Sequence, residues 1–146
     1  MRKIESSISI QSKPDNIISA FTDFEMLHGW WGVERTLVQK KVGGLYTLAW
    51  GISDKGFGFV MNGIIDEYQL DKGLVIKNLV YLNPEKPFLG PMTLTIKAAK
   101  KEKLTEAYLC QDGYQSGKDW DWYYEAVKSA WPDVMQTLKD YLENKI

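Results

Sequence analysis

The chain has 146 residues, of which 45% are hydrophobic and 25% charged, and this composition is typical of a globular domain with one core. A formal net charge of −1 argues against a nucleic-acid surface, and no apolar run approaches the roughly 18 residues of a membrane span. No apolar run follows the basic N-terminus, as a signal peptide would require, and the single cysteine excludes an intrachain disulfide. We therefore expect one domain over residues 1–146, a monomer in the cytoplasm that binds neither nucleic acid nor membrane.

The N-terminal part predicts one strand followed by two short helices. Residues 2–10 alternate between apolar and polar side chains, with Ile4, Ile8 and Ile10 on one face, as in a half-buried strand. Ser12-Lys13-Pro14-Asp15 is typical of a helix start, and Asp23 can cap a second short helix before the Trp30-Trp31 pair.

From about residue 33 the apolar period changes to two, which indicates strands. The candidate strands are 33–39, 43–50, 57–66, 74–82, 92–98 and 103–111. Their connections are short, and short connections between consecutive strands favour an antiparallel meander. One face of this sheet is much more apolar than the other, so it needs a covering layer.

The last stretch, Asp119 to Lys145, supplies that layer as a long amphipathic helix. At about 100° per residue its apolar side chains fall on one line. They are Trp120, Tyr123, Tyr124, Val127, Trp131, Val134, Met135, Leu138, Tyr141 and Leu142. The stripe keeps its phase on both sides of Pro132, so we interpret the stretch as one helix kinked at the proline. Trp122 points away from the stripe, either under the preceding loop or toward a ligand or partner.

Nineteen aromatic residues, namely six Trp, eight Tyr and five Phe, are the unusual feature of the composition. Many of them converge between the predicted sheet and helix. Large rings are hard to pack without voids in a small domain, and buried Tyr and Trp need polar partners. Composition alone leaves open whether they fill a solid core or line a cavity. The candidate lining residues are Trp30, Trp31, Tyr46, Trp50, Phe57, Phe59, Tyr81, Tyr124, Trp131 and Met135.

Catalytic and metal-binding motifs are weak. His28 is the only histidine, and Cys110 on a strand is most often a small buried hydrophobe. The carboxylates at Asp112, Asp119, Asp121 and Glu125 are better explained as caps of the long helix than as metal ligands. We therefore expect no metal and no cofactor, and a role for His28 as a base is the least favoured reading. The basic cluster of Lys97, Lys100, Lys101 and Lys103 falls on a predicted hairpin tip, which is usually a solvated turn.

Motifs spread over the whole length resemble the START-like (Bet v 1-like, SRPBCC, helix-grip) superfamily, and within it the activator of Hsp90 ATPase homologue 1-like family. The matching segments are Pro14 with Ile18, Ala20 and Phe21; Leu27 with Trp30-Trp31; Val42–Tyr46; Gly63–Glu67; Thr105–Leu109 leading to Gly113; and Trp131 with Leu138, Lys139, Tyr141, Leu142 and Glu143. The resemblance implies an α+β helix-grip fold: a curved antiparallel sheet of six or seven strands around a long C-terminal helix, with two short helices after the first strand. The family often carries a histidine near the position of Gln111. The glutamine in this chain therefore removes one candidate polar group.

The leading hypothesis is a protein without catalytic activity that binds a small hydrophobic or aromatic ligand between sheet and helix. The alternative is a protein-interaction module related to Hsp90 ATPase activators, which would contact a chaperone or regulatory protein through Trp122, Lys100, Lys101 and Lys103. Fold resemblance does not decide between them.

Overall fold

The structure, a computed structural model, describes residues 2–144. Its elements in chain order are β1 (Lys3–Ile10), α1 (Pro14–Ala20), α2 (Phe24–Trp31), β2 (Arg35–Val38), β3 (Leu45–Trp50), β4 (Phe59–Gln69), β5 (Gly73–Leu82), β6 (Leu89–Lys101), β7 (Leu104–Asp112) and α3 (Lys118–Leu142). The predicted α+β helix-grip fold, with two short helices after the first strand and a long C-terminal helix, is confirmed. The last residue of the predicted helix, Lys145, lies outside the described residues.

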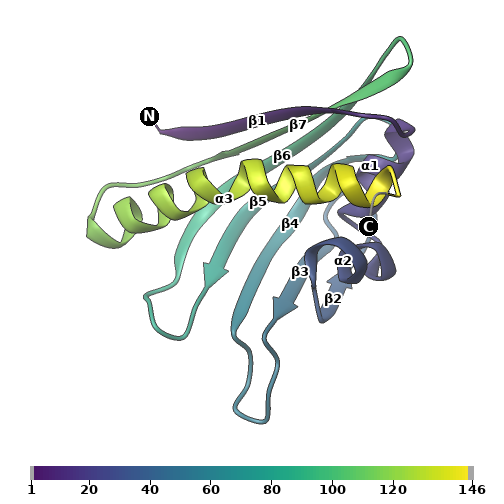
Figure 1. Cartoon of the computed structure of the whole chain (residues 1–146). Coiled ribbons are helices and arrows are strands. Elements are labelled where there is room, and N and C mark those ends of the chain that lie inside the picture. Colours follow the sequence, from purple (N-terminus) through teal and green to yellow (C-terminus); the bar gives the residue numbers. More distant parts are fainter. Residues whose placement is uncertain (1, 145–146) are drawn as a thin grey trace.

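The seven strands form one antiparallel sheet in the order β1-β7-β6-β5-β4-β3-β2. Strands β2 to β7 follow one another as a meander, and β1 joins the far side by pairing with β7. The register of β4 against β5 shifts around Gly63, where a Cβ would lie 2.5 Å from Ile76 Cγ2. Such bulges bend a strand, so the glycine permits the close approach at a point where the sheet curves. The concave face that results is the one on which α3 lies (Figure 1).

The long helix crosses the sheet in front of its central strands (Figure 1). Its backbone approaches β1 on one side and α2 on the other. It runs without interruption through Pro132, which is exposed, while Tyr123, Trp131, Met135 and Leu138 are buried. The proline therefore lies where a carbonyl that lacks its helical donor can meet water. Because the backbone of the helix rests on the flanking elements, its buried side chains bridge the space to the middle of the sheet.

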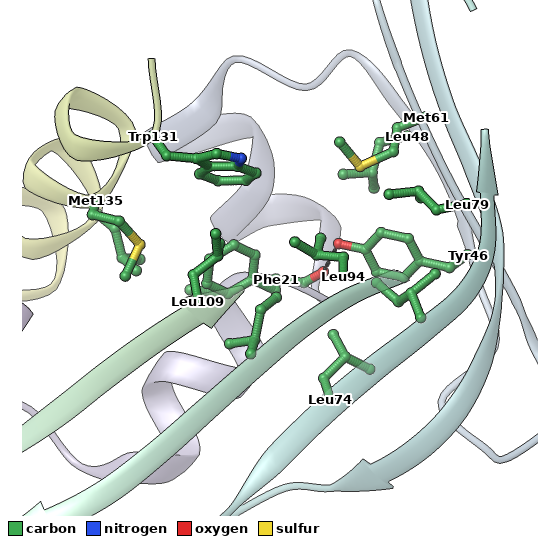
Figure 2. Packing of buried hydrophobic residues seen from close by; sticks show 14 of the residues in the cluster. Phe21, Tyr46, Leu48, Met61, Leu74, Leu79, Leu94, Leu109, Trp131 and Met135 are labelled. Carbon is green, nitrogen blue, oxygen red and sulfur yellow. Dashed lines mark hydrogen bonds between the residues drawn. The ribbon is translucent and has the colours of Figure 1, made fainter. Parts of the chain in front are cut away.

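One end of this space is filled solidly. Figure 2 shows Trp131 and Met135 projecting from α3 toward Leu48, Leu79 and Leu94 of the sheet. Tyr46 is fully buried and donates its hydroxyl to the carbonyl of Phe21 at 2.6 Å. The indole of Trp30 likewise donates to the carbonyl of Ala20 at 2.7 Å. Both rings have their polar atoms satisfied by carbonyl groups at the C-terminal end of α1, as buried Tyr and Trp require.

Several predicted strand boundaries need correction. The strand predicted over 33–39 is limited to Arg35–Val38, whereas that predicted over 92–98 extends over Leu89–Lys101. The strand predicted from residue 57 starts at Phe59, because Ser53 and Gly56 exchange backbone hydrogen bonds and hold the preceding residues in a loop. Phe57 therefore lies in this loop and is 56% exposed, not on the inner face of the sheet.

Candidate functional site

An apolar cleft of about 590 Å³ opens between the N-terminal half of α3 and the neighbouring ends of α2, β3, β4 and β5. Its lining residues on β3, β4 and β5 belong to the strand ends that Figure 1 shows away from the hairpin joining β6 and β7. Its lining residues are Trp31, Trp50, Gly51, Phe59, Met61, Tyr81, Asn83, Gln111, Trp122, Tyr123, Ala126, Val127, Ala130, Trp131 and Val134. The volume is within the usual range for small-molecule sites.

Tryptophan rings form much of the wall. The ring of Trp31 meets Trp50 edge-on at 5.1 Å and lies 5.6 Å from Trp131 between ring centroids. The indole N–H of Trp50 donates to the carbonyl of Trp31 at 3.0 Å, so this polar atom is satisfied within the protein. These contacts fix the rings against one another and present apolar surface to the cleft.

Small side chains on α3 keep the cleft open. Ala126 and Ala130 are exposed and face it beside Val127 and Val134. Positions 126, 130 and 134 recur every four residues and therefore share one face of the helix. Longer side chains at these positions would occupy the volume that the cleft now provides.

One buried polar network reaches the cleft. The side chain of Gln111 on β7 is 1% exposed, and its Oε1 accepts a hydrogen bond from the indole Nε1–H of Trp131 at 2.9 Å. Its Nε2 donates to the hydroxyl oxygen of Tyr123 at 3.0 Å and lies 3.4 Å from the sulfur of Met92. An indole N–H can only donate, so the bond to Trp131 fixes which end of the amide is the acceptor. Gln111 thus ties α3 to the sheet through two aromatic residues.

Burial raises the pKa of both tyrosines that line the cleft. Desolvation raises the pKa of Tyr123 well above its ordinary value, although the hydrogen bond from Gln111 opposes this. Desolvation also raises the pKa of Tyr81, against the effect of a hydrogen bond with Asn83. Both side chains are therefore neutral phenols near pH 7, suited to hydrogen bonding and not to acting as bases.

Aromatic residues also surround the mouth. Trp122 is 40% exposed, and the ammonium group of Lys86 lies 4.6 Å from its ring centroid. Phe59 and Tyr81 also line the cleft and stack with their ring centroids 6.2 Å apart. Among the described lining residues none is charged, so the interior of the cleft offers apolar surface and a few neutral polar atoms.

The structure brings together half of the candidate ligand residues. Trp31, Trp50, Phe59, Tyr81 and Trp131 line the cleft. The other five lie elsewhere: Trp30, Tyr46 and Met135 in the solid core, Phe57 on the loop before β4, and Tyr124 beside Tyr114 and Arg2. A ring on the apolar stripe of α3 can thus contact Arg2 and the loop between β7 and α3 instead of the cleft.

Residues that were not predicted complete the site. In the sequence Gln111 stands out only as the absence of a histidine, yet in the structure it is the centre of the polar network. Its signal was a polar side chain in phase with Ala107 and Leu109, which are both buried on the inner face of β7. Tyr123 belongs to the apolar stripe, but its spacing does not indicate that its hydroxyl meets Gln111.

The remaining candidates for chemistry lie outside the cleft. His28 is exposed, stacks on Phe24, and has Nδ1 2.9 Å from the carbonyl oxygen of Val33. Cys110 is buried on β7, as expected of a small hydrophobe. Within residues 2–144 no group of three or more His, Cys, Asp or Glu side chains is arranged to hold a metal ion. No helix in the same part of the chain is long and apolar enough to cross a membrane.

The residues of the predicted partner surface do not form one patch. Lys100, Lys101 and Lys103 are exposed at the turn between β6 and β7, where Lys101 pairs with Glu106 at 3.2 Å. Figure 1 shows this turn at the end of the molecule opposite the first turns of α3, which carry Trp122. A partner that contacts both would have to span the whole sheet.

Solved structures share the architecture. A protein from Mesorhizobium loti, MLL2253, superposes with a TM-score of 0.77 at 18% identity, covering 99% of each chain. A protein from Colwellia psychrerythraea, described as an Aha1 dimer, gives a TM-score of 0.73 at 17% identity and covers 98% of this chain and 97% of its own. DynU16, from the dynemicin biosynthetic locus, gives 0.70 at 15% identity, but this chain matches only 47% of it.

At such identities these likenesses show the fold alone. No curated protein matches the chain significantly. The family model described as "Activator of Hsp90 ATPase homolog 1-like protein" matches residues 11–143, which is nearly the whole sequence. The chain belongs to the Activator of Hsp90 ATPase homolog 1-like family.

Proposed function

We propose that the protein binds a small, largely apolar, ring-containing molecule in the cleft between α3 and the sheet, without transforming it. The observation that carries the proposal is the lining: aromatic and aliphatic side chains dominate it, and none of the described lining residues is charged. Small-molecule sites combine such apolar walls with a few convergent polar atoms. Here the polar atoms belong to Gln111, Tyr123, Tyr81 and Asn83.

The chemistry of these polar groups favours binding over catalysis. An amide does not ionise near neutral pH, and burial raises the pKa of both tyrosines, so each is held as a neutral phenol. General acid–base catalysis works best with groups whose pKa lies near the operating pH. The cleft is therefore better suited to hold a molecule than to transfer its protons.

Tryptophan fluorescence provides the test, because Trp31, Trp50, Trp122 and Trp131 line the cleft. We expect neutral ring compounds such as flavone and 9-fluorenone to quench the emission saturably. They should also raise the melting temperature through linkage to the folded state. Failure of a broad panel of neutral ring compounds to produce either effect would overturn the proposal.

A variant that fills the cleft localises the effect. Ala130→Trp places a large ring on the exposed face of α3 that borders the cleft, so we expect it to abolish quenching while the protein stays folded. Ser129→Trp is the matched control, because Ser129 is the neighbouring exposed residue and does not line the cleft. Equal binding by both variants would place the ligand elsewhere.

A second candidate function is that of a protein-interaction module acting on a chaperone. The observations that favour it are the family description and the exposed ring of Trp122 at the cleft mouth, with Phe88 exposed on the loop after β5. Its test is the ATPase rate of purified Hsp90 with and without the protein. Stimulation that Trp122→Ala removes would support this role, and an unchanged rate with the unmodified protein would exclude it.

A further inference from the structure

The hydroxyl group of Tyr123 has a defined direction. Its oxygen accepts a hydrogen bond from Gln111 Nε2. The Oε1 of the same amide accepts a hydrogen bond from the indole N–H of Trp131. Gln111 can therefore not turn its amide to accept from Tyr123 without leaving the indole N–H unpaired. The hydroxyl hydrogen must point away from Gln111.

That hydrogen has no acceptor in the part of the chain that the structure describes. The bond from Gln111 is the one hydrogen bond of the Tyr123 side chain there, although the residue is only 4% exposed. A buried donor without an acceptor is unfavourable, so a ligand that excludes water from the cleft must offer an acceptor to this hydroxyl or leave it unpaired. Both Tyr123 and Gln111 line the cleft, and a bound molecule can therefore reach this group.

We propose that the ligand of the cleft is a neutral ring compound carrying a carbonyl oxygen, and that Tyr123 binds this oxygen through its hydroxyl while Gln111 holds the hydroxyl in position. This inference rests on the proposed function and adds the chemical class of the ligand. A carboxylate or ammonium group in the interior would find no opposite charge among the described lining residues and would lose its hydration. A hydrocarbon would fit the walls but would leave the Tyr123 donor unpaired.

The matched probes 9-fluorenone and fluorene test this preference, because both are flat three-ring molecules and one of them carries the carbonyl. From the usual net value of a hydrogen bond, we expect 9-fluorenone to bind about 2- to 13-fold more tightly than fluorene. The comparison uses the full chain without mutation and therefore does not depend on the folding of any variant.

Substitutions test whether the Tyr123 hydroxyl causes the preference for 9-fluorenone over fluorene. Tyr123→Phe should reduce the affinity for 9-fluorenone to that for fluorene and leave fluorene binding unchanged. Tyr114→Phe is the control: it also removes a buried hydroxyl, which has no partner among the described residues, but one that does not line the cleft. It should keep the preference. Gln111→Met should reduce the preference for 9-fluorenone over fluorene. If Gln111 only stabilised the fold, its replacement would leave this preference unchanged.

The outcomes separate the two proposals. Equal affinity for 9-fluorenone and fluorene, or a preference that survives Tyr123→Phe, would overturn the carbonyl inference while the cleft remained a ligand site. Binding of neither probe would overturn the carbonyl inference together with the proposed function. A preference that Tyr123→Phe removes and Tyr114→Phe retains would establish the assignment.

Discussion

Replacing Gln111 by methionine is the change that tests the polar network most directly. Methionine keeps the length of the side chain and removes both its donor and its acceptor. The indole N–H of Trp131, a residue that is 4% exposed, then loses its acceptor at 2.9 Å. Tyr123 also loses the donor to its oxygen at 3.0 Å.

The expected loss of stability follows from the unpaired indole N–H of Trp131. Leaving one buried donor unpaired costs about 1–3 kcal/mol, and this orphaned N–H dominates the change. We therefore expect Gln111→Met to lower the free energy of unfolding by about 1–3 kcal/mol, measured by urea denaturation. Gln69→Met is the control, since Gln69 is exposed at the end of β4 and should change stability by less than about 0.5 kcal/mol.

A double-mutant cycle with Trp131→Phe isolates the hydrogen bond from the loss of packing. Phenylalanine has no N–H to leave unpaired, so Gln111→Met should cost less in that background. We expect a coupling energy of about 1–2 kcal/mol, within the range found for residues in contact. Additivity within about 0.3 kcal/mol would show that the Gln111–Trp131 bond does not stabilise the protein, and would refute the network.

Three further predictions concern stability. Tyr123→Phe should destabilise the protein by about 1 kcal/mol, because Gln111 Nε2 loses its oxygen acceptor and keeps only the sulfur of Met92. Tyr114→Phe should be neutral or stabilising, because that hydroxyl has no partner among the described residues, and urea denaturation compares the two variants. Gly63→Ala should cost about 1–3 kcal/mol by the same assay, because its Cβ would lie 2.5 Å from Ile76 Cγ2. Burial raises the pKa of Tyr46, so the unfolded chain releases this proton at lower pH than the native state. The free energy of unfolding should be unaffected below about pH 9 and should fall above about pH 10, by up to about 1.4 kcal/mol per pH unit for each such tyrosine. An alkaline stability profile checks this, and a flat profile up to pH 11 would contradict it.

The helix and the sheet could be predicted from sequence because periodicity is a local property. The apolar stripe kept its phase across Pro132, and α3 indeed continues through the proline with Trp131 and Met135 buried on either side of it. Strand ends were less well predicted, since alternation does not show where pairing stops. Phe57 continued the alternation of β4, but the turn between Ser53 and Gly56 removes it from the sheet.

The cleft was only half predictable, because periodicity tells which side chains turn inward but not which neighbour they meet. Tyr124 lies on the stripe, yet it contacts Tyr114 at 5.1 Å instead of facing the cleft. Trp122 lies off the stripe, yet it forms part of the rim, because the helix rests on β1 and α2 and leaves its N-terminal half open on one side. The pairing of Gln111 with Tyr123 and Trp131 depends on the placement of α3 over β7, which sequence spacing does not give.

The central claim is that ligands enter the cleft between α3 and the sheet, and the indole N–H signals of the six tryptophans test it in one NMR titration. On addition of 9-fluorenone we predict the largest shifts for Trp31, Trp50, Trp122 and Trp131, which line the cleft, and smaller ones for Trp30 and Trp120, which do not. Saturable shifts confined to the first four would place the ligand in the cleft. Shifts largest at Trp30 or Trp120, or no saturable shift at any indole, would contradict the account.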